Sequence, residues 1–169
     1  MIYYIGQFFG ILSTALCLVL PFFPQKRQML IVTGLVNALC GLNLICIGRV
    51  GSVILIYVVA VIQTFAALRH LKRNTDPSRL ENITFLLLYV VCGSLDLRGI
   101  IDILPVVGSV FHMLATFQKD VGKTRVLLLF NAGTFLSYYI LVRSTAGFAC
   151  VCTLTTTLAA MYKYRKSET

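Results

Sequence analysis

Long apolar blocks separated by short polar gaps form the dominant pattern of this chain. Each block is close to the roughly 20 residues that an α-helix needs to cross the hydrocarbon of a bilayer. The pattern predicts spanning helices at about residues 2–23, 29–47, 51–71, 79–95, 99–117, 125–142 and 146–164. Because the connections are short, consecutive helices are expected to be antiparallel neighbours. An all-α membrane protein with seven transmembrane helices is therefore expected.

The charged residues give this bundle an orientation. Most of the fifteen Lys and Arg residues lie in every second gap, beginning with the gap that holds Lys26 and Arg27. The other gaps hold only Arg49, Arg98 and Arg143. Since positively charged loops stay in the cytoplasm, the N-terminus is expected outside and the C-terminus inside.

The composition of the chain indicates which kind of partner its positive charge serves, nucleic acid or the lipid bilayer. The chain is 58% hydrophobic and only 12% charged, which leaves too little polar surface for a soluble protein of 169 residues. Its net charge of +9 would suggest nucleic acid in a soluble protein. Here the basic residues stand at the ends of apolar segments, so the expected partner is the lipid bilayer with its anionic inner leaflet, and no nucleic acid.

The two halves of the chain resemble each other. At a spacing of 94 residues, Asn37 falls on Asn131, and at a spacing of 93 the run 64–68 falls on 157–161. An interval of that length contains four spans, so both copies would have the same orientation. Parallel repeats of this kind occur in membrane transporters, with the binding site near the bilayer midplane between the repeats.

The repeat predicts a three-one-three division of the chain. The predicted parts are a three-helix repeat at residues 1–74, a cytoplasmic linker with the fourth helix at 75–97, and a second three-helix repeat with a short basic tail at 98–169. Within the linker, Ser78 and Glu81 have the spacing of a capping box and predict the start of the fourth helix.

Asn37 and Asn131 are the sharpest candidates for a binding site, because each lies inside an apolar helix at a matched place in the two halves. A carboxamide in hydrocarbon needs hydrogen-bond partners. One interpretation is that the pair converges on a neutral polar ligand. The other is that each amide joins two helices in a closely packed interface.

Three further polar residues are candidates with the same two interpretations. They are Gln63 on the third helix, Thr157 on the seventh and His112 on the fifth. A histidine inside the membrane either contacts a ligand or is a neutral imidazole bonded to a neighbouring helix.

Two other features of the fifth helix have simple explanations. Asp102 stands four residues after Arg98, which predicts a helical ion pair. Pro105 is expected inside this helix, where it would free a carbonyl near residue 101 and either open a kink beside a cavity or only bend the helix.

Enzyme chemistry is not expected. The chain has no Gly-rich phosphate loop, no HExxH, no GxSxG, and only six carboxylate residues in all. Its six cysteines lie in apolar stretches without the spacing of metal ligands, so no metal or other cofactor is predicted.

The order of segments resembles the YgjV-type bacterial inner membrane proteins. The likeness is carried by residues 104–109, by 125–143 and by 26–48, and it implies a multi-pass protein of the bacterial cytoplasmic membrane. The three-one-three layout is also distantly similar to SWEET and PQ-loop transporters. Pro24 and Gln25 stand where that superfamily carries a Pro-Gln pair, but the second copy departs from the pattern. The SWEET asparagines on the third and seventh helices are absent as well, so sugar specificity is not implied.

Two functions remain open at this point. The first is a facilitative transporter that passes a small neutral metabolite by alternating access between the two repeats. The second is a receptor, scaffold or accessory subunit that uses the same bundle without moving solute. The sequence gives neither a substrate nor an oligomeric state.

Overall fold

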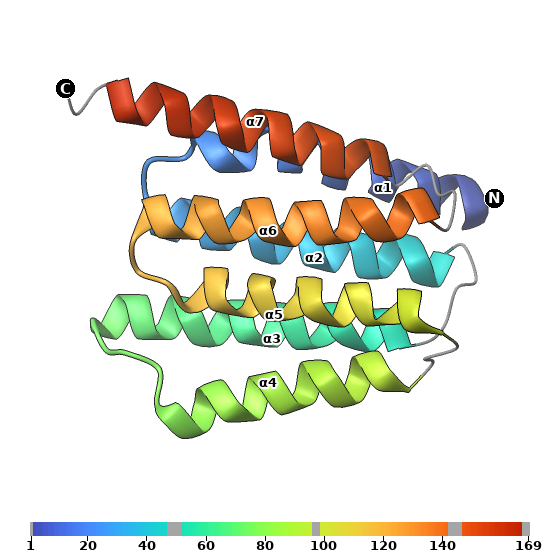
Figure 1. Cartoon of the computed structure of the whole chain (residues 1–169), viewed down its shortest axis with the longest axis horizontal. Helices are drawn as coiled ribbons and strands as arrows, with labels where there is room; N and C mark the ends of the chain where they lie inside the picture. The colour runs from blue at the N-terminus through green and yellow to red at the C-terminus, as the bar shows by residue number, and fades with distance from the viewer. Residues whose placement is uncertain (1, 47–51, 96–98, 142–146, 167–169) are drawn as a thin grey trace.

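The computed structural model describes residues 2–46, 52–95, 99–141 and 147–166, and all of its regular elements are helical. Figure 1 shows the helices lying side by side along one direction. Their bounds are α1 Ile2–Val19, the short 3₁₀ helix η1 Leu20–Phe22, α2 Lys26–Cys46, α3 Ser52–Arg73, α4 Arg79–Ser94, the 3₁₀ helix η2 Ile100–Asp102, α5 Ile103–Phe117, α6 Val121–Leu141 and α7 Gly147–Lys166. The expected all-helical fold with seven α-helices is confirmed.

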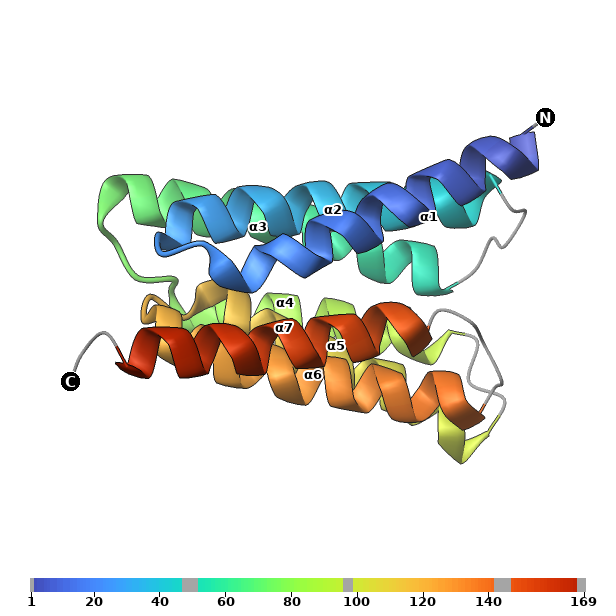
Figure 2. The same ribbon diagram turned by 90° about the horizontal axis from the view of Figure 1, so that it is seen from above.

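The helices form two layers, as the second view makes plain (Figure 2). One layer contains α1, α2 and α3 in chain order, and the other contains α5, α6 and α7. The layers meet where α1 packs on α7 and where α3 packs on α5. Helix α4 packs against α3 and α5, and it thereby covers one edge of the two-layer arrangement.

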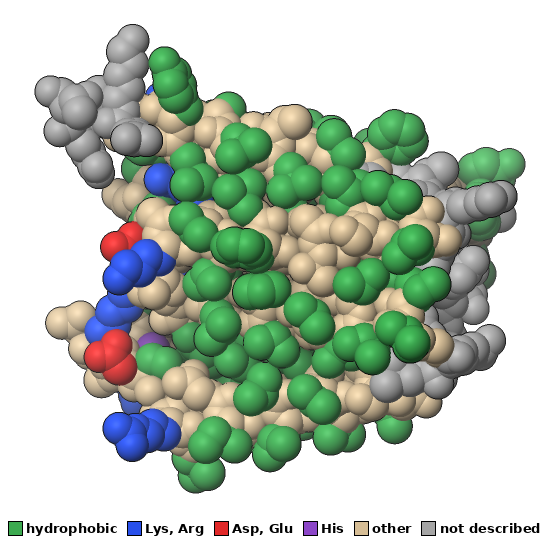
Figure 3. Space-filling view, viewed as in Figure 1, with side chains coloured by type: hydrophobic (Ala, Val, Ile, Leu, Met, Phe, Trp, Pro, Cys, Tyr) green, Lys and Arg blue, Asp and Glu red, His purple; other side chains and the backbone are tan. Residues whose placement is uncertain are grey.

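Apolar side chains are spread over the face of the bundle that Figure 3 shows, and the charged side chains of the described residues gather at one end of it. Phe8, Phe65 and Leu87 are more than half exposed. We call the charged end the basic end; it is the end where α1 stops and α2 begins. Two helices of the described residues, Ile2–Phe22 and Ile54–Arg73, are long and apolar enough to cross a membrane by length and composition. Arg49, Arg98 and Arg143, which the orientation argument places at the opposite end, lie outside the described residues.

Helix α4 begins where the capping residues predict. The hydroxyl of Ser78 accepts a hydrogen bond of 3.0 Å from the backbone N–H of Glu81. The carboxylate of Glu81 lies 2.7 Å from the ring Nε2 of His70 at the end of α3. This contact joins the end of α3 to the start of α4.

Pro105 lies in the first turn of α5, which begins at Ile103 directly after η2. A proline in the first turn gives up an N–H that lacks a partner within the α-helix, so the position tolerates it. The predicted ion pair between Arg98 and Asp102 lies outside the described side chains.

Two apolar clusters fill the interior. One lies between α3, α4 and α5 and consists of Ile56, Val59, Ala60, Phe85, Tyr89 and Met113. The other lies where α1, α2, α5 and α6 meet and consists of Leu20, Met29, Ala115 and Leu128. The second cluster joins the two layers directly beside the basic end.

Close packing of α5 on α6 gives a first prediction, for Gly108→Ala. A Cβ at this position would lie 2.7 Å from the ring of Phe135, so the ring must move. Overpacking costs roughly 1–3 kcal/mol, and the better helix propensity of Ala returns about 1 kcal/mol. We expect a net loss of about 1 kcal/mol in the free energy of unfolding, measured in mixed micelles.

Gly133→Ala is the matched control, because a Cβ at that helical glycine meets nothing within 4 Å. It should raise the free energy of unfolding by up to about 1 kcal/mol. Equal effects of the two substitutions would contradict the packing of α5 on α6 described above.

Candidate functional site

A polar contact joins the two layers deep in the bundle. The side-chain amide nitrogen of Asn37 on α2 lies 3.2 Å from the ring Nε2 of His112 on α5. Asn37 is buried, with 6% of its surface exposed. Because the amide nitrogen can only donate, the ring Nε2 of a neutral imidazole accepts, and its remaining proton lies on Nδ1. The structure thus gives His112 a partner from a neighbouring helix.

Asn131 makes a different contact from its counterpart. Its side-chain amide donates a hydrogen bond of 2.8 Å to the backbone carbonyl of Gly108, so it joins α6 to α5 within one layer. The partners of the two asparagines, His112 and Gly108, are one helical turn apart on α5. Asn37 therefore bridges the layers, whereas Asn131 does not.

Gln63 belongs to a third place, at the junction of α3, α4 and α5. Its amide nitrogen donates to the backbone carbonyl of Met113 at 3.0 Å, and its amide oxygen accepts from the hydroxyl of Tyr89 at 2.8 Å. Gln63 and Tyr89 have no exposed surface. The amide nitrogen and the amide oxygen thus both have partners, and Gln63 on α3 joins α4 and α5.

This junction gives a second prediction, for Tyr89→Phe. The change removes the only hydrogen bond described for the buried amide oxygen of Gln63 and leaves it unpaired. An unpaired buried acceptor costs roughly 1–3 kcal/mol. We expect the free energy of unfolding to fall by about 2 kcal/mol, whereas Tyr162→Phe, at a residue that is 73% exposed, should change it by less than about 0.5 kcal/mol. If Tyr89→Phe left the free energy of unfolding unchanged, the amide oxygen of Gln63 would have another partner.

Thr157 differs from its neighbours on α7. Thr153 and Thr156 donate to carbonyls of their own helix. Thr157 is fully buried, and its hydroxyl is the buried side-chain atom that has no hydrogen-bond partner among the described residues. The matched residue Thr64 on α3 donates to Ala60 at 2.8 Å. The two halves thus differ at this matched position.

Lys26 is buried at the boundary between the layers, a feature that the sequence argument did not foresee. Only 8% of its surface is exposed. Its ammonium donates to the backbone carbonyl of Ala115 at 2.6 Å and to the hydroxyl of Thr124 at 2.8 Å. Ala115 lies in the last turn of α5, where carbonyls lack partners within the helix. Lys26 therefore caps a helix of the opposite layer.

Arg125 makes the reverse connection. It is 5% exposed, and its Nε and Nη2 donate to the backbone carbonyls of Pro21 at 3.0 Å and Phe23 at 3.2 Å. Its guanidinium carbon lies 4.1 Å from the centre of the Tyr164 ring. The hydroxyl of Tyr164 donates to the carbonyl of Phe22 at 2.6 Å. One cation on α6 thus joins the ends of α1 and α7.

The two connections are reciprocal in the sequence. Lys26 in the first half binds Ala115 in the second, and Arg125 in the second half binds Pro21 in the first. Pro21 and Ala115 are 94 residues apart, the spacing at which Asn37 falls on Asn131. The basic end is therefore closed by two cations, each of which binds the end of the first helix of the other half.

Several polar side chains lie between the layers. We call the contact of α2 with α5 and α6 the seam. Its polar members are Lys26, Thr33, Asn37, His112, Thr116 and Thr124. Three of them, Lys26, Thr33 and Asn37, follow helical spacing along α2.

Two small cavities adjoin Lys26. One of about 20 Å³ lies toward the basic end and is lined also by His70 and Lys119. The other, of about 10 Å³, is lined also by Thr33 and His112. Each is close to the volume that holds a single water molecule, far below the roughly 300 Å³ of a small ligand pocket.

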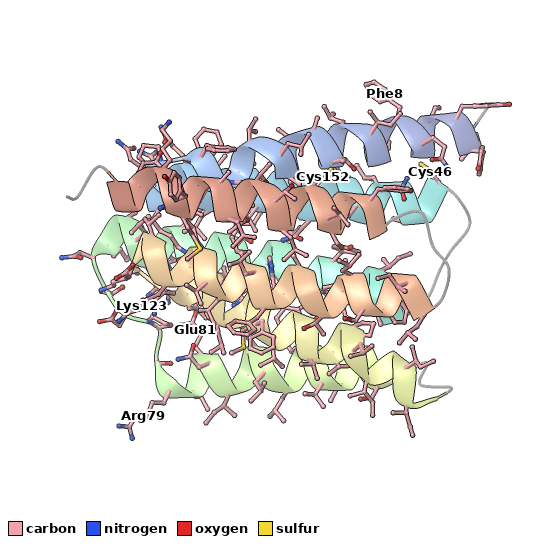
Figure 4. All side chains as sticks on the ribbon, turned by 45° about the horizontal axis from the view of Figure 1, so that its top comes forward. Phe8, Cys46, Arg79, Glu81, Lys123 and Cys152 are labelled. Atoms are coloured by element: carbon pink, nitrogen blue, oxygen red, sulfur yellow. The ribbon has the colours of Figure 1, made fainter. Side chains whose placement is uncertain are left out.

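Positive charge exceeds negative charge near the seam. In the described part of the chain, the ion pairs are His70 with Glu81 and Lys119 with Asp76, each at 2.7 Å. Figure 4 shows Arg79, Glu81 and Lys123 at this end of the bundle. The acceptors described for Lys26 and Arg125 are all uncharged oxygens.

Asp120 is the acidic residue nearest the seam in sequence, and it caps α6. Its carboxylate accepts a hydrogen bond of 3.0 Å from the backbone N–H of Lys123, and this bond holds the pKa of the carboxyl below its usual value. A depressed folded-state pKa means that the cap stabilises the fold above the ordinary carboxyl pKa and that this contribution is lost as the pH falls through the lowered value.

A family comparison gives this bundle its identity. The family model Imp-YgjV, described as a bacterial inner membrane protein, matches residues 4–168. No curated protein and no solved structure matches the chain. The match covers nearly the whole chain and agrees with the apolar exterior of the helices. The chain belongs to the Imp-YgjV family and is a bacterial inner membrane protein.

Proposed function

We propose that this protein is a facilitative transporter of a small polar solute, and that the two helix layers move relative to each other to expose the seam to one side of the membrane at a time. In this proposal the structure is the state closed at the basic end. Asn37 and His112 contact the solute, and Lys26 and Arg125 hold the closed end together.

The polar seam is the observation that carries the proposal. Polar and ionisable groups inside a membrane protein are costly, and they usually mark a path for solute or ions. Here they lie between the layers: Asn37 with His112 deep in the bundle, and Lys26 with Thr124 at the basic end. The ammonium of Lys26 lies at the boundary between the two layers, where a change in their contact would change its hydrogen bonds.

The closure at the basic end supports alternating access. Lys26 and Arg125 cross from one layer to the other through a few hydrogen bonds to carbonyl and hydroxyl groups. Such bonds break and reform without loss of the helices themselves. Rocking of one repeat against the other is the usual motion of transporters built from repeats.

The small size of the cavities favours the second function, a receptor, scaffold or accessory subunit. Cavities of about 20 Å³ and 10 Å³ leave no room for a metabolite in this state. In addition, Gln63 and Asn131 have hydrogen-bond partners that account for them as packing residues. The transporter proposal therefore requires a second state in which the layers separate.

Solute exchange across the membrane of proteoliposomes tests the proposal. Purified protein would be reconstituted and assayed for counterflow of labelled sugars, nucleosides, vitamins, amino acids and small organic acids, with protein-free liposomes as the control. We expect saturable exchange of one class without accumulation against a gradient. A correctly folded protein that exchanges none of these classes would favour the receptor or scaffold function.

A further inference from the structure

We propose that the seam is a binding site for a small organic anion of the monocarboxylate class, and that Lys26 is its charged ligand. The inference deepens the proposed transport function by naming the charge of the solute. It replaces the neutral metabolite expected from the sequence. Binding itself does not depend on transport, so the two proposals can fail separately.

The position of Lys26 is the first step of the argument. It is more than nine-tenths buried, and it lines both of the cavities described at the seam. The first cavity leads to His70 and Lys119 near the basic end, and the second leads to Thr33 and His112 deeper in the bundle. Lys26 therefore adjoins two small neighbouring spaces, one lined by His70 and Lys119 and the other by His112.

The charge balance is the second step. Lys26 has only uncharged acceptors, a carbonyl and a hydroxyl. Its ammonium carries three N–H donors, and the described contacts use two of them. A buried cation without a counter-ion is costly, so an anion at this place would be stabilised more strongly than a neutral solute.

The acidic groups of the neighbouring elements do not supply that counter-ion. Asp76 pairs with Lys119, Glu81 pairs with His70, and Asp120 caps α6 through the N–H of Lys123. Each of these carboxylates is thus already engaged at the basic end. A bound ligand can supply the negative charge that would pair with the ammonium of Lys26.

An anion would compete with the carbonyl of Ala115 for the ammonium of Lys26, and this competition links ligand binding to separation of the two layers. A carboxylate accepts a stronger hydrogen bond from Lys26 than the carbonyl of Ala115 does, because both partners are then charged. A bound anion that displaces Ala115 breaks one of the connections between the layers. The spaces on either side of Lys26 are each close to the volume of one water molecule, so a carboxylate can enter only as the layers separate at the seam.

Thermal unfolding with a matched pair of probes tests the site. The protein in detergent would be titrated with sodium lactate and with lactamide, which has nearly the same shape but no charge, at constant ionic strength with sodium chloride. We expect lactate to raise the Tm saturably, by about 5 °C at a hundredfold excess over its Kd, and lactamide to have no effect.

Three variants link this shift to Lys26. Lys26→Met should abolish the lactate effect, and Lys26→Arg should retain part of it because the charge remains. Arg27→Met is the matched control, since Arg27 is the next residue on α2 and is exposed; its lactate shift should equal that of the native protein. If Lys26→Met does not fold, the Arg variant and the lactamide comparison still decide the question.

Measuring solute flux beside the Tm shift distinguishes the proposed anion site from the proposed transport function. Equal shifts with lactate and lactamide, or a full lactate shift in Lys26→Met, would overturn the anion site. A lactate shift that depends on Lys26 without lactate counterflow in proteoliposomes would keep the anion site and remove the transport function. Counterflow of a neutral solute that is insensitive to Lys26→Met would keep transport and overturn the anion site.

Discussion

Replacing Arg125 by Met should lower the free energy of unfolding by about 3 kcal/mol. The substitution removes the donor for the backbone carbonyls of Pro21 and Phe23, which cannot be replaced by apolar groups because they belong to the main chain. Each buried carbonyl left without a partner costs roughly 1–3 kcal/mol, and the lost contact with the Tyr164 ring adds about 1 kcal/mol. The Met variant also avoids the free-energy cost of burying a guanidinium, and this offsets part of the loss in stability.

Chemical unfolding in mixed micelles measures this loss, with hydrogen exchange as a second readout. Exchange should increase at the end of α1 and the start of α6, because Arg125 connects them. Lys123→Met is the matched control, since Lys123 lies on the same helix with an exposed side chain. An Arg125→Met protein as stable as the Lys123→Met protein would mean that Arg125 is hydrated rather than bound to α1.

Replacing Asn37 by Leu should lower solute flux at least tenfold, which corresponds to about 1.4 kcal/mol or more in the transport barrier. The change keeps the approximate volume, removes the hydrogen bond across the seam and leaves the ring Nε2 of His112 without its donor. If Asn37 contacts the solute, the rate constant of exchange falls together with binding. Counterflow per folded molecule is the measurement.

Asn131→Leu is the matched control for this prediction. Asn131 bonds Gly108 within one layer, so its loss should cost about 1 kcal/mol of stability and change flux by less than about twofold. Equal losses of flux in both variants would instead support the convergent pair that the repeat suggested. Unchanged flux in Asn37→Leu would remove Asn37 from the site.

The helices of this protein could be predicted closely because a bilayer imposes their length and apolarity. Helix α4 begins at Arg79, as the spacing of Ser78 and Glu81 indicated. Helices α2 and α6 begin earlier than predicted, at Lys26 and Val121, because the apolar pattern marks hydrocarbon and takes no account of the turn outside it. The orientation of the helices across the membrane stays a prediction from the distribution of Lys and Arg.

The site could be predicted only in part. Asn37 and His112 were each chosen as candidates, but the sequence could not say that they meet, because it does not show which helices of the two halves face each other. Lys26 was interpreted only as an orientation signal. A stronger signal was present: Lys26, Met29 and Leu30 share one face of α2 with Thr33 and Asn37, so a cation stands on a buried stripe.

The large sequence separation between Lys26 and its hydrogen-bond acceptors has a consequence for how the protein is assembled during synthesis. Its two acceptors, Ala115 and Thr124, lie 89 and 98 residues later in the chain. During synthesis, the hairpin of α1 and α2 therefore exists before any group that can bind this ammonium, and Lys26 must stay in contact with water or lipid headgroups until α5 and α6 are made. Arg125, in contrast, emerges after Pro21 and Phe23. The last hydrogen bonds of the basic end can form only when the second half arrives, so the nascent first half remains open at this end until α5 and α6 have been made.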